Sequence, residues 1–422
     1  MMSDTKYDYD VIVIGAGLAG LQAARRLQDE GLRVVVLERD DAVGGRMRTD
    51  RIDGFQLDRG FQVLNPAYSS VRRWVDVKSL DLQHFEVGVK LRDARGISTL
   101  AHPLRHPGLL PQTLGSGYLR PGELIALARW LGPTLLRESV SLRATRDTSL
   151  TKSLDRAGIT GPLRRNVLDT FLAGVLADAD GTSSANFTRI LLRTFAFGSP
   201  GLPRGGMQAL PEQLAASLHE RPLTDHDVTG IHDHGDGVTV DTSSGTFRAQ
   251  RVVVATDPVG AADLTDLTAP RMKGLSTWWF SADTPPASDG FILMDASRPG
   301  GGAAGPVLHA AVVSNVAPSY APSGRHLIEA TALLGSAPTS ESEVRADLER
   351  MYATSTATWE LITRHDVPHA LPEQLPPLVD RKPQRISDRV FVAGDHRDTA
   401  SINGALMSGD RAARAITGLI RG

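Results

Sequence analysis

The chain has 422 residues, of which 41% are hydrophobic and 22% are charged. This length exceeds what one hydrophobic core usually serves, so we expect two domains. A net charge of −2 gives no sign of nucleic-acid binding, and the absence of cysteine excludes disulfides, cysteine-ligated metals and a thioether-linked flavin. Because no stretch reaches the ~18 apolar residues of a membrane-spanning helix, the sequence predicts a cytoplasmic protein.

The chain opens with the pattern of a dinucleotide-binding turn. An apolar run beginning at Val11 ends at Gly15, and a helical pattern starts near Leu18. Gly15 permits a tight turn, Gly17 lets a pyrophosphate approach the backbone, and Gly20 allows close packing of helix on strand. The N-terminus of the helix then presents free N–H groups to the phosphates.

A second strand, over residues 34–37, ends at Glu38. A carboxylate at this place accepts hydrogen bonds from a ribose diol and disfavours a 2′-phosphate. Gly44-Gly45-Arg46 follows shortly afterwards. These features together predict that the chain binds an adenine dinucleotide.

Residues 76–200 are rich in leucine, arginine and helical patterns, such as the one over residues 163–176. Within this region, residues 100–136 interleave leucines with arginines and prolines. This pattern is typical of a helix packed into a substrate domain, and it leaves open a peripheral contact with a membrane surface.

The remaining elements alternate between strand and helix patterns. Residues 203–207 precede a helical stretch over 209–218. Strand-like runs extend from 224 to 256, with a turn at 243–245 followed by one run at 246–248 and another at 252–256. Strand patterns over 276–280 and 307–313 accompany a helix over 341–351. Residues 389–395 predict a buried strand ending in Gly394 and Asp395, followed by a helix over 405–416.

Three of these blocks resemble the flavin amine oxidase and phytoene desaturase superfamily. They are the N-terminal turn with Glu38 and Gly44-Gly45-Arg46, the segment 203–207, and the segment 390–409. The resemblance implies FAD as the cofactor. It also implies an α/β fold, with a discontinuous Rossmann-like FAD-binding domain of the glutathione-reductase type and a mixed α+β substrate domain.

The turn and the resemblance together give a set of expected FAD contacts. By resemblance, Asp395 bonds the ribityl or phosphate portion, the backbone at Val228 contacts the adenine, and the segment 402–405 lies by the pyrimidine side of the flavin ring. A helix beginning near Ala405 would direct its dipole at that ring. The expected contacts are Gly15, Gly17, Leu18, Ala19, Gly20, Glu38, Arg39, Gly44, Gly45, Arg46, Gly60, Phe61, Gln62, Val228, Gly394, Asp395, Ile402, Asn403 and Ala405.

Two features that amine oxidases commonly carry are missing. By rough matching, the lysine that is water-bridged to the flavin falls on Ser276 or Thr277, and Lys273 is out of register. The aromatic residue before the C-terminal glycine–alanine pair is replaced by the segment 401–403. The resemblance therefore favours the desaturase-like branch, whose members act on lipophilic substrates.

Three polar residues are candidates for catalysis: His396, Gln62 and His309. A histidine titrates near neutral pH and can take a proton from an N–H group. His396 directly follows Asp395, although a surface loop is the simpler interpretation of its position. His232 and His234 have a spacing that suits a metal, but a solvated loop between strands explains them better, so no metal is expected.

The sequence thus predicts an FAD-binding domain from 1–75, 200–260 and 375–422, and a substrate domain from 76–199 and 261–374. The predicted function is abstraction of hydride from a C–H or C–N bond of a small-to-medium, partly apolar substrate, followed by reoxidation by oxygen or another acceptor. The alternatives are an amine oxidase of the usual type, a redox-neutral flavin isomerase of the carotenoid-isomerase type, and a non-catalytic flavin-binding interaction module. The expected partner is a small molecule, and the oligomeric state is left open.

Overall fold

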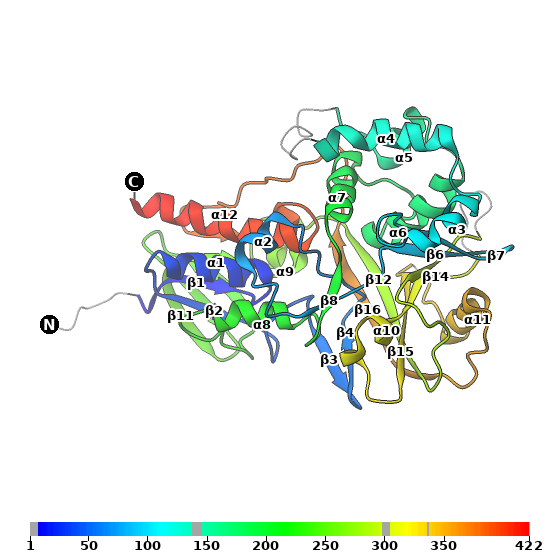
Figure 1. Cartoon of the computed structure of the whole chain (residues 1–422). Helices are drawn as coiled ribbons and strands as arrows, with labels where there is room; N and C mark the ends of the chain where they lie inside the picture. Colours follow the sequence, from blue (N-terminus) through cyan, green and yellow to red (C-terminus); the bar gives the residue numbers. More distant parts are fainter. Residues whose placement is uncertain (1–6, 137–145, 298–303, 336, 422) are drawn as a thin grey trace.

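A computed structural model describes residues 7–136, 146–297, 304–335 and 337–421 of the chain. In these residues two large sheets lie apart from each other (Figure 1). The first sheet contains β1 (Tyr9–Ile14), β2 (Val34–Leu37), β9 (Val228–Asp233), β10 (Val238–Thr242), β11 (Gly245–Val254) and β17 (Val390–Val392). The second contains β6 (Gly88–Asp93), β7 (Gly96–Ala101), β12 (Met272–Ala282), β13 (Ile292–Asp295), β14 (Val307–Val312), β15 (His326–Leu333) and β16 (Glu360–Pro372).

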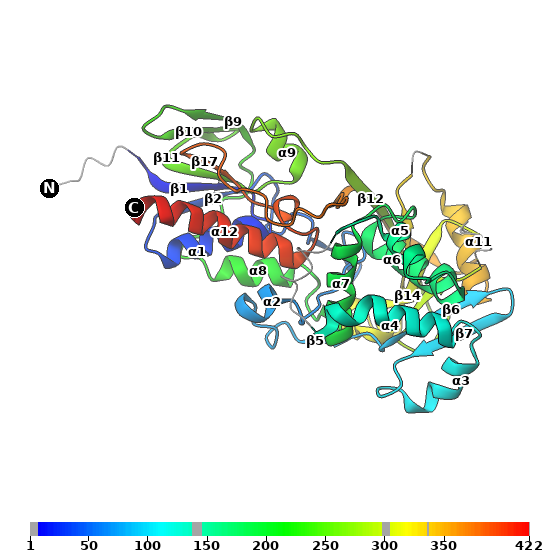
Figure 2. The same ribbon diagram turned by 90° about the horizontal axis from the view of Figure 1, so that it is seen from above.

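The centre of the first sheet is parallel. β1 pairs in parallel with β2 and β11, and β11 pairs in parallel with β17. All of β2 and the last four residues of β1 are buried, as expected for β-branched strands covered on both faces. Helices α1 (Leu18–Asp29), α8 (Ala209–Ala216) and α12 (Ile402–Arg421) lie along this sheet in Figures 1 and 2.

Two sequence expectations about this sheet need correction. The runs expected on either side of residue 250 form one continuous strand, β11, because its N-terminal half pairs with β10 while its C-terminal half pairs with β1 and β17. His232 lies within β9 and not in a loop, since it pairs with Thr239 of β10.

The second sheet has the order β16-β12-β15-β14-β13-β6-β7 and is antiparallel except for the pair β6–β13. Helices α4 (Pro121–Leu136), α5 (Leu150–Arg156), α6 (Asp169–Leu176) and α7 (Ala185–Phe197) lie on one side of it in Figure 1. Helix α11 (Glu341–Tyr352) packs against β13 and β14 through Val344, Leu348 and Met351, after a capping box at Ser340.

The remaining α-helices and strands lie in the segments that join the two parts, except for α3 and α10, which lie within the second part. They are β3 (Thr49–Ile52), β4 (Phe55–Asp58), β5 (Leu82–His84), β8 (Gly201–Pro203), α2 (Ser69–Trp74), α3 (Leu110–Gly115), α9 (Pro258–Asp263) and α10 (Val313–Val316). We refer to the first sheet with α1, α8 and α12 as the parallel half, and to the second sheet with α4–α7 and α11 as the antiparallel half.

The fold class is the one predicted, a mixed α/β protein with a Rossmann-like sheet. Every strand of the first sheet falls within 1–75, 200–260 or 375–422, and every strand of the second within 76–199 or 261–374. The domain boundaries themselves stay a prediction.

Candidate cofactor and substrate site

The three glycines of the N-terminal turn have three different surroundings. Gly15 has a φ of +99°, and a Cβ there would lie 2.8 Å from the Ala255 carbonyl oxygen. A Cβ at Gly20 would lie 2.0 Å from the Gly15 carbonyl oxygen, so helix α1 contacts the turn directly. A Cβ at Gly17 would meet no protein atom within 4 Å, which leaves this side of the backbone accessible to a ligand.

The N-terminus of α1 is suited to an anion. Its N-cap is Gly17, and no described side chain caps the first turn, where Leu18 and Ala19 lie buried. The backbone N–H groups of this turn therefore keep their hydrogen-bonding capacity, and the positive end of the helix dipole points the same way.

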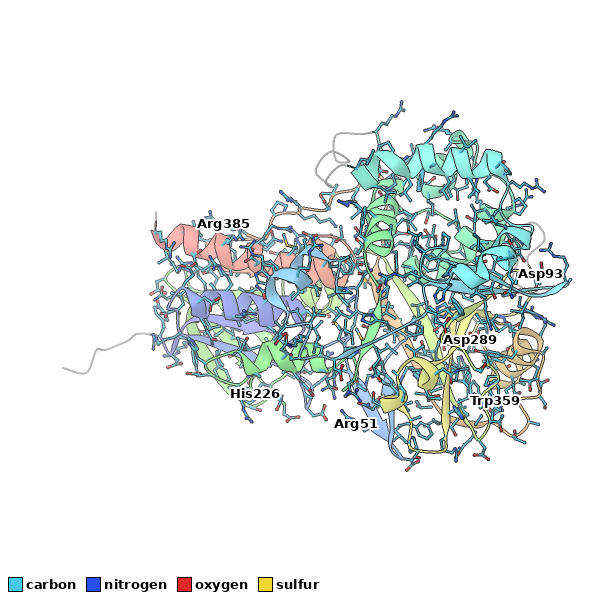
Figure 3. The ribbon with its side chains drawn as sticks, in the orientation of Figure 1. Arg51, Asp93, His226, Asp289, Trp359 and Arg385 are labelled. Atoms are coloured by element: carbon cyan, nitrogen blue, oxygen red, sulfur yellow. The ribbon has the colours of Figure 1, made fainter. Side chains whose placement is uncertain are left out.

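Glu38 is held beside the turn by backbone hydrogen bonds. Its carboxylate accepts from the N–H of Ala16 at 2.6 Å and of Asp40 at 3.0 Å. The backbone of Glu38 also bonds to Leu223 and His226. His226 is labelled in Figure 3, at the lower edge of the parallel half. Val228 starts β9 just beyond it, so Glu38 and Val228 lie on neighbouring segments.

Arg46 and Asp395 join two distant parts of the chain. The Arg46 Nη2 donates to Asp395 Oδ1 at 2.7 Å, and Nη1 donates to the Ala370 carbonyl at 2.8 Å. Burial works against the charge on Arg46, but attraction to Asp395 outweighs it and raises the pKa of the guanidinium. The Gly44 N–H donates to the Ala16 carbonyl, which ties the loop of Gly44 and Gly45 to the turn.

The Gln62 side chain holds the backbone of two nearby arginines. Its Nε2 donates to the carbonyl oxygens of Arg46, at 2.8 Å, and of Arg59, at 3.3 Å. The side chain proposed from sequence as a catalytic candidate therefore fixes the backbone that carries Arg46.

The expectation that His396 lies in a surface loop is wrong. Its side chain is buried, at 5% exposure, and neither ring nitrogen has a hydrogen-bond partner among the described residues. Burial lowers the pKa of His396 to about 4, while the neighbouring Asp395 acts in the opposite direction. A buried polar ring without partners calls for an explanation, and a polar ligand next to Asp395 would supply one.

Helix α12 begins at Ile402, earlier than the expected start near Ala405. The Ser401 hydroxyl accepts from the Gly404 N–H at 3.0 Å. The Asn403 side chain accepts from Ser70 N at 3.1 Å and so holds α2 against α12. Contacts from residues 402–405 to a cofactor would therefore come from the backbone.

The structure brings most of the expected FAD contacts into one region. The bonds Gly44–Ala16, Arg46–Asp395 and Gln62–Arg46 connect the glycine turn, the segment 44–62 and the segment 394–396. Arg39 is the exception, because its side chain is 67% exposed and pairs with Asp40. The open side of Gly17, the uncapped N-terminus of α1 and the unpartnered ring of His396 all fit an adenine dinucleotide.

Phe61 lies between this region and the antiparallel half. Its backbone N–H donates to Thr277 Oγ1 of β12 at 3.1 Å. Its ring lies 5.3 Å from that of His309 and 5.7 Å from that of Phe85. The segment 60–62 is therefore one contact between the predicted cofactor site and the second sheet, in addition to the bond from Arg46 to Ala370 of β16.

A side-chain pair, the partly buried His309 and the buried Glu329, lies next to this contact. His309 Nδ1 lies 3.1 Å from Glu329 Oε1, and Thr331 Oγ1 donates to Glu329 Oε2 at 3.0 Å. Thr331 Oγ1 is 3.4 Å from Thr277 Oγ1. Glu329 is completely buried, whereas 15% of the His309 side chain is exposed. Polar groups thus extend from the Phe61 backbone to the imidazole of His309.

Sequence reasoning identified His309 but missed Glu329, Thr331 and Thr277 as its companions. The pairing depends on the register of β14 against β15, where His309 faces Thr331. The sequence offered one signal for this pair: Glu329 is a single carboxylate in the apolar run of residues 327–333, and a buried carboxylate needs a polar partner.

The Lys273 side chain binds Asp178 and Ser183 and not the segment around Phe61. Its Nζ lies 3.1 Å from Asp178 Oδ2 and donates to Ser183 Oγ at 3.2 Å. Burial alone would raise the pKa of Asp178, but hydrogen bonds from Ser183 and the charge of Lys273 lower it. The residue of β12 that contacts Phe61 is Thr277, one of the two positions matched to the amine oxidase lysine.

The two histidines considered for metal binding have other partners. His232 Nε2 lies 3.0 Å from Asp241 Oδ2, and His234 Nε2 lies 2.9 Å from Thr239 Oγ1. No cluster of three or more possible metal ligands occurs in the part of the chain that the structure describes.

The fold and the glycine turn define a two-part dinucleotide-binding protein of the α/β class. The sequence profile described as flavin containing amine oxidoreductase matches residues 18–417. The chain therefore belongs to the flavin-containing amine oxidoreductase family. The family is named for its flavin, and FAD is the cofactor of this chain.

Several sequence relatives are named as amine oxidases. The chain is 30% identical over 288 residues to putrescine oxidase of Kocuria rosea, an alignment covering 61% of this chain and 58% of the relative. It is 29% identical over 268 residues to polyamine oxidase 4 of rice, Oryza sativa subsp. japonica, covering 59% and 51%. The matched region thus spans less than two thirds of each relative.

Solved structures show the same fold over the whole chain. The structure of cyclohexylamine oxidase from Brevibacterium oxydans IH-35A has a TM-score of 0.67 at 19% identity and covers 98% of this chain and 100% of its own. No helix among the described residues combines the length and apolar character needed to cross a membrane. The desaturase-like branch stays a prediction.

Proposed function

We propose that the protein removes a hydride from a C–H bond next to nitrogen in a small-to-medium, partly apolar amine, with reoxidation by oxygen or another acceptor. The observation that carries the proposal is the His309–Glu329 pair, which contacts the predicted cofactor site through Phe61. The names of the sequence relatives support an amine as the substrate class.

The residues of the parallel half would hold the cofactor. Gly17 and the α1 N-terminus would bind the pyrophosphate, Glu38 the ribose, and Asp395 with Arg46 the ribityl portion. When bound, FAD supplies the chemistry that accepts the hydride and its two electrons. The buried ring of His396, without partners of its own, would donate a hydrogen bond to the same cofactor.

His309 would take the proton that the substrate nitrogen must lose. Its Nδ1 is bonded to Glu329, which leaves Nε2 for a substrate N–H. The bond from Glu329 fixes the orientation of the ring. An amine that has given up a hydride to the cofactor and this proton to His309 would become an imine.

The surroundings of His309 support a partly apolar substrate. The rings of Phe61 and Phe85 contact each other edge to face, and Phe61 also contacts the imidazole. Because Lys273 is paired with Asp178, a lysine from this position would not assist the flavin as in the usual amine oxidases. The proposed chemistry therefore relies on the histidine.

The test is anaerobic mixing of the purified yellow protein with a panel of amines that differ in length and apolar character. We expect one class to bleach the flavin band and to give an imine or its hydrolysis product, with colour returning in air. A changed product without bleaching would favour the flavin isomerase. A yellow protein that stays inert towards every reductant would favour the interaction module.

The role of His309 is tested with His309→Gln and a matched control, His326→Gln. His326 lies on β15 like Glu329, but its ring contacts Ser314 instead. In H309Q we expect flavin reduction to slow about 100-fold, with FAD affinity unchanged. Equal rates in the two variants would contradict the assignment.

A further inference from the structure

Helix α4 is apolar on a side that the protein does not cover. Its buried residues Glu123, Trp130 and Thr134 follow helical spacing and face inward. Trp130 packs under Arg189 of α7 and donates to Ser153 of α5 at 2.9 Å. On the outer side, Leu124 is 39% exposed, Ile125 53% and Leu136 88%.

The outer side of α4 carries no carboxylate. Glu123, the one acidic residue in the sequence between 94 and 136, is turned inward. It accepts backbone hydrogen bonds from Gly161 at 2.7 Å and from Leu163 and Arg164 at 3.1 Å. The exposed arginines Arg105, Arg120 and Arg129 have no ion-pair partner among the described residues.

A second exposed apolar segment precedes α4 in the sequence. Leu104 is 86% exposed, and on α3 Leu110 is 38% and Leu114 64% exposed. Helix α3 ends at Gly115, shortly before α4 begins at Pro121. In Figures 1 and 2 both helices lie at the outer side of the antiparallel half, away from α1 and α12.

We propose that this surface docks on an anionic lipid bilayer. The α3–α4 surface is defined by Leu104, Leu110, Leu114, Leu124, Ile125 and Leu136, together with Arg105, Arg120 and Arg129. Leucine and isoleucine side chains enter the boundary between headgroups and acyl chains, while arginines bind lipid phosphates. The chain as a whole has a net charge of −2, so the positive charge of this surface does not reflect an excess of basic residues in the whole chain.

Charge argues for lipid over a second copy of this chain. Two copies meeting through this surface would bring like-charged arginines together without any carboxylate to pair with them. A bilayer that contains acidic phospholipid supplies both the apolar interior and the negative charge. The proposal is independent of the substrate that the enzyme oxidises.

The chain offers a matched control for the apolar contact. Leu124 and Ile125 are consecutive residues on a helix, and so are Leu419 and Ile420 at the end of α12, with exposures of 38% and 46%. The two pairs are similar in chemistry and exposure but lie in different halves of the molecule.

The test is flotation of the FAD-loaded protein with phosphatidylcholine vesicles, with and without phosphatidylglycerol, at low and high salt. We expect binding to the anionic vesicles that weakens with salt. The double variant L124Q/I125Q should bind about tenfold more weakly, R120Q/R129Q should reduce the salt-sensitive part, and L419Q/I420Q should behave as wild type. Flavin absorbance and Tm confirm that each variant is folded.

Three results would overturn the proposal. The first is the absence of wild-type binding to anionic vesicles. The second is equal weakening in L419Q/I420Q and L124Q/I125Q. The third is self-association of the wild-type protein, measured by sedimentation, that L124Q/I125Q abolishes, because the surface would then join two copies of the chain.

Discussion

The parallel half and the antiparallel half present their polar groups in different ways. In the parallel half most of these polar groups belong to the backbone. Gly15 and Gly20 shape the turn, and Gly17 leaves the first N–H groups of α1 accessible. In the antiparallel half the polar groups are side chains on different strands, such as His309 and Glu329. The glycines of this turn lie close together in the sequence, whereas the proposed substrate site depends on how two separate strands pair.

The largest effect is expected from a side chain placed inside the backbone cradle. In Gly20→Ala, the new Cβ would meet the Gly15 carbonyl oxygen at 2.0 Å. We expect a loss of about 3 kcal/mol or more in the free energy of unfolding, together with loss of bound FAD. Thermal unfolding and flavin absorbance measure both effects.

The control is Gly418→Ala on α12, where a Cβ meets no atom within 4 Å. Helix propensity predicts equal or slightly higher stability for it. If G20A were as stable as G418A, the cradle would not depend on its backbone contacts.

In the antiparallel half, Lys273→Met should reduce stability without changing the chemistry. It leaves the buried Asp178 carboxylate without its cation, at a cost of about 3 kcal/mol. Flavin reduction per bound FAD should stay near the wild-type rate. The double variant K273M/D178N should recover part of the lost stability. Abolished flavin reduction at unchanged Tm would instead give Lys273 a role at the flavin.

Two buried groups should give opposite pH dependences of stability. Burial lowers the pKa of His396 from 6.5 to about 4, so the unfolded chain binds a proton first and stability falls as pH decreases through this window. Burial raises the pKa of Asp58 from 3.8 to about 6, so the unfolded chain loses its proton first and stability falls as pH increases.

Each of these effects amounts to about 3 kcal/mol and they oppose each other between roughly pH 4 and 6. Relative to wild type, His396→Asn should therefore lose stability as pH rises across this window, and Asp58→Asn should gain it. Urea unfolding of the FAD-free protein at several pH values measures the slopes. Identical slopes in the two variants would contradict the burial of these groups.

The smallest effect is expected from a side chain of the parallel half. Arg46 uses two donors, one for Asp395 and one for the Ala370 carbonyl, and a lysine cannot reproduce both. Arg46→Lys should weaken FAD binding about tenfold, as measured by fluorescence titration. The exposed Arg421→Lys should leave it unchanged. If R46K lost more FAD affinity than G17A, the side chain of Arg46 would contribute more to FAD binding than the backbone at Gly17, contrary to our expectation.

The parts that the sequence predicted are those with local patterns. The turn at Gly15 and the carboxylate of Glu38 lie within one strand–helix–strand unit, and their geometry follows from residue type and spacing. The strand before Asp395 was equally visible as an apolar run. The FAD cofactor and the family follow from these segments.

The parts that escaped prediction depend on distant contacts. The polar residues after His396 suggested a surface loop. In the structure, Arg397 donates a hydrogen bond to the Pro383 carbonyl and Asp398 accepts one from Arg411, and the histidine beside them is buried. The pairing of His309 with Glu329 requires the register of two strands that are separated in sequence by α10 and a loop. No pattern within either strand determines that register.

Gly17→Ala and Glu329→Gln together test whether cofactor binding and substrate chemistry belong to different halves of the molecule. FAD affinity and the rate of flavin reduction by the best amine of the panel, at saturating FAD, are measured for both. G17A should weaken FAD binding while keeping the reduction rate, and E329Q should keep FAD affinity while slowing reduction. Parallel loss of both quantities in both variants would contradict the account.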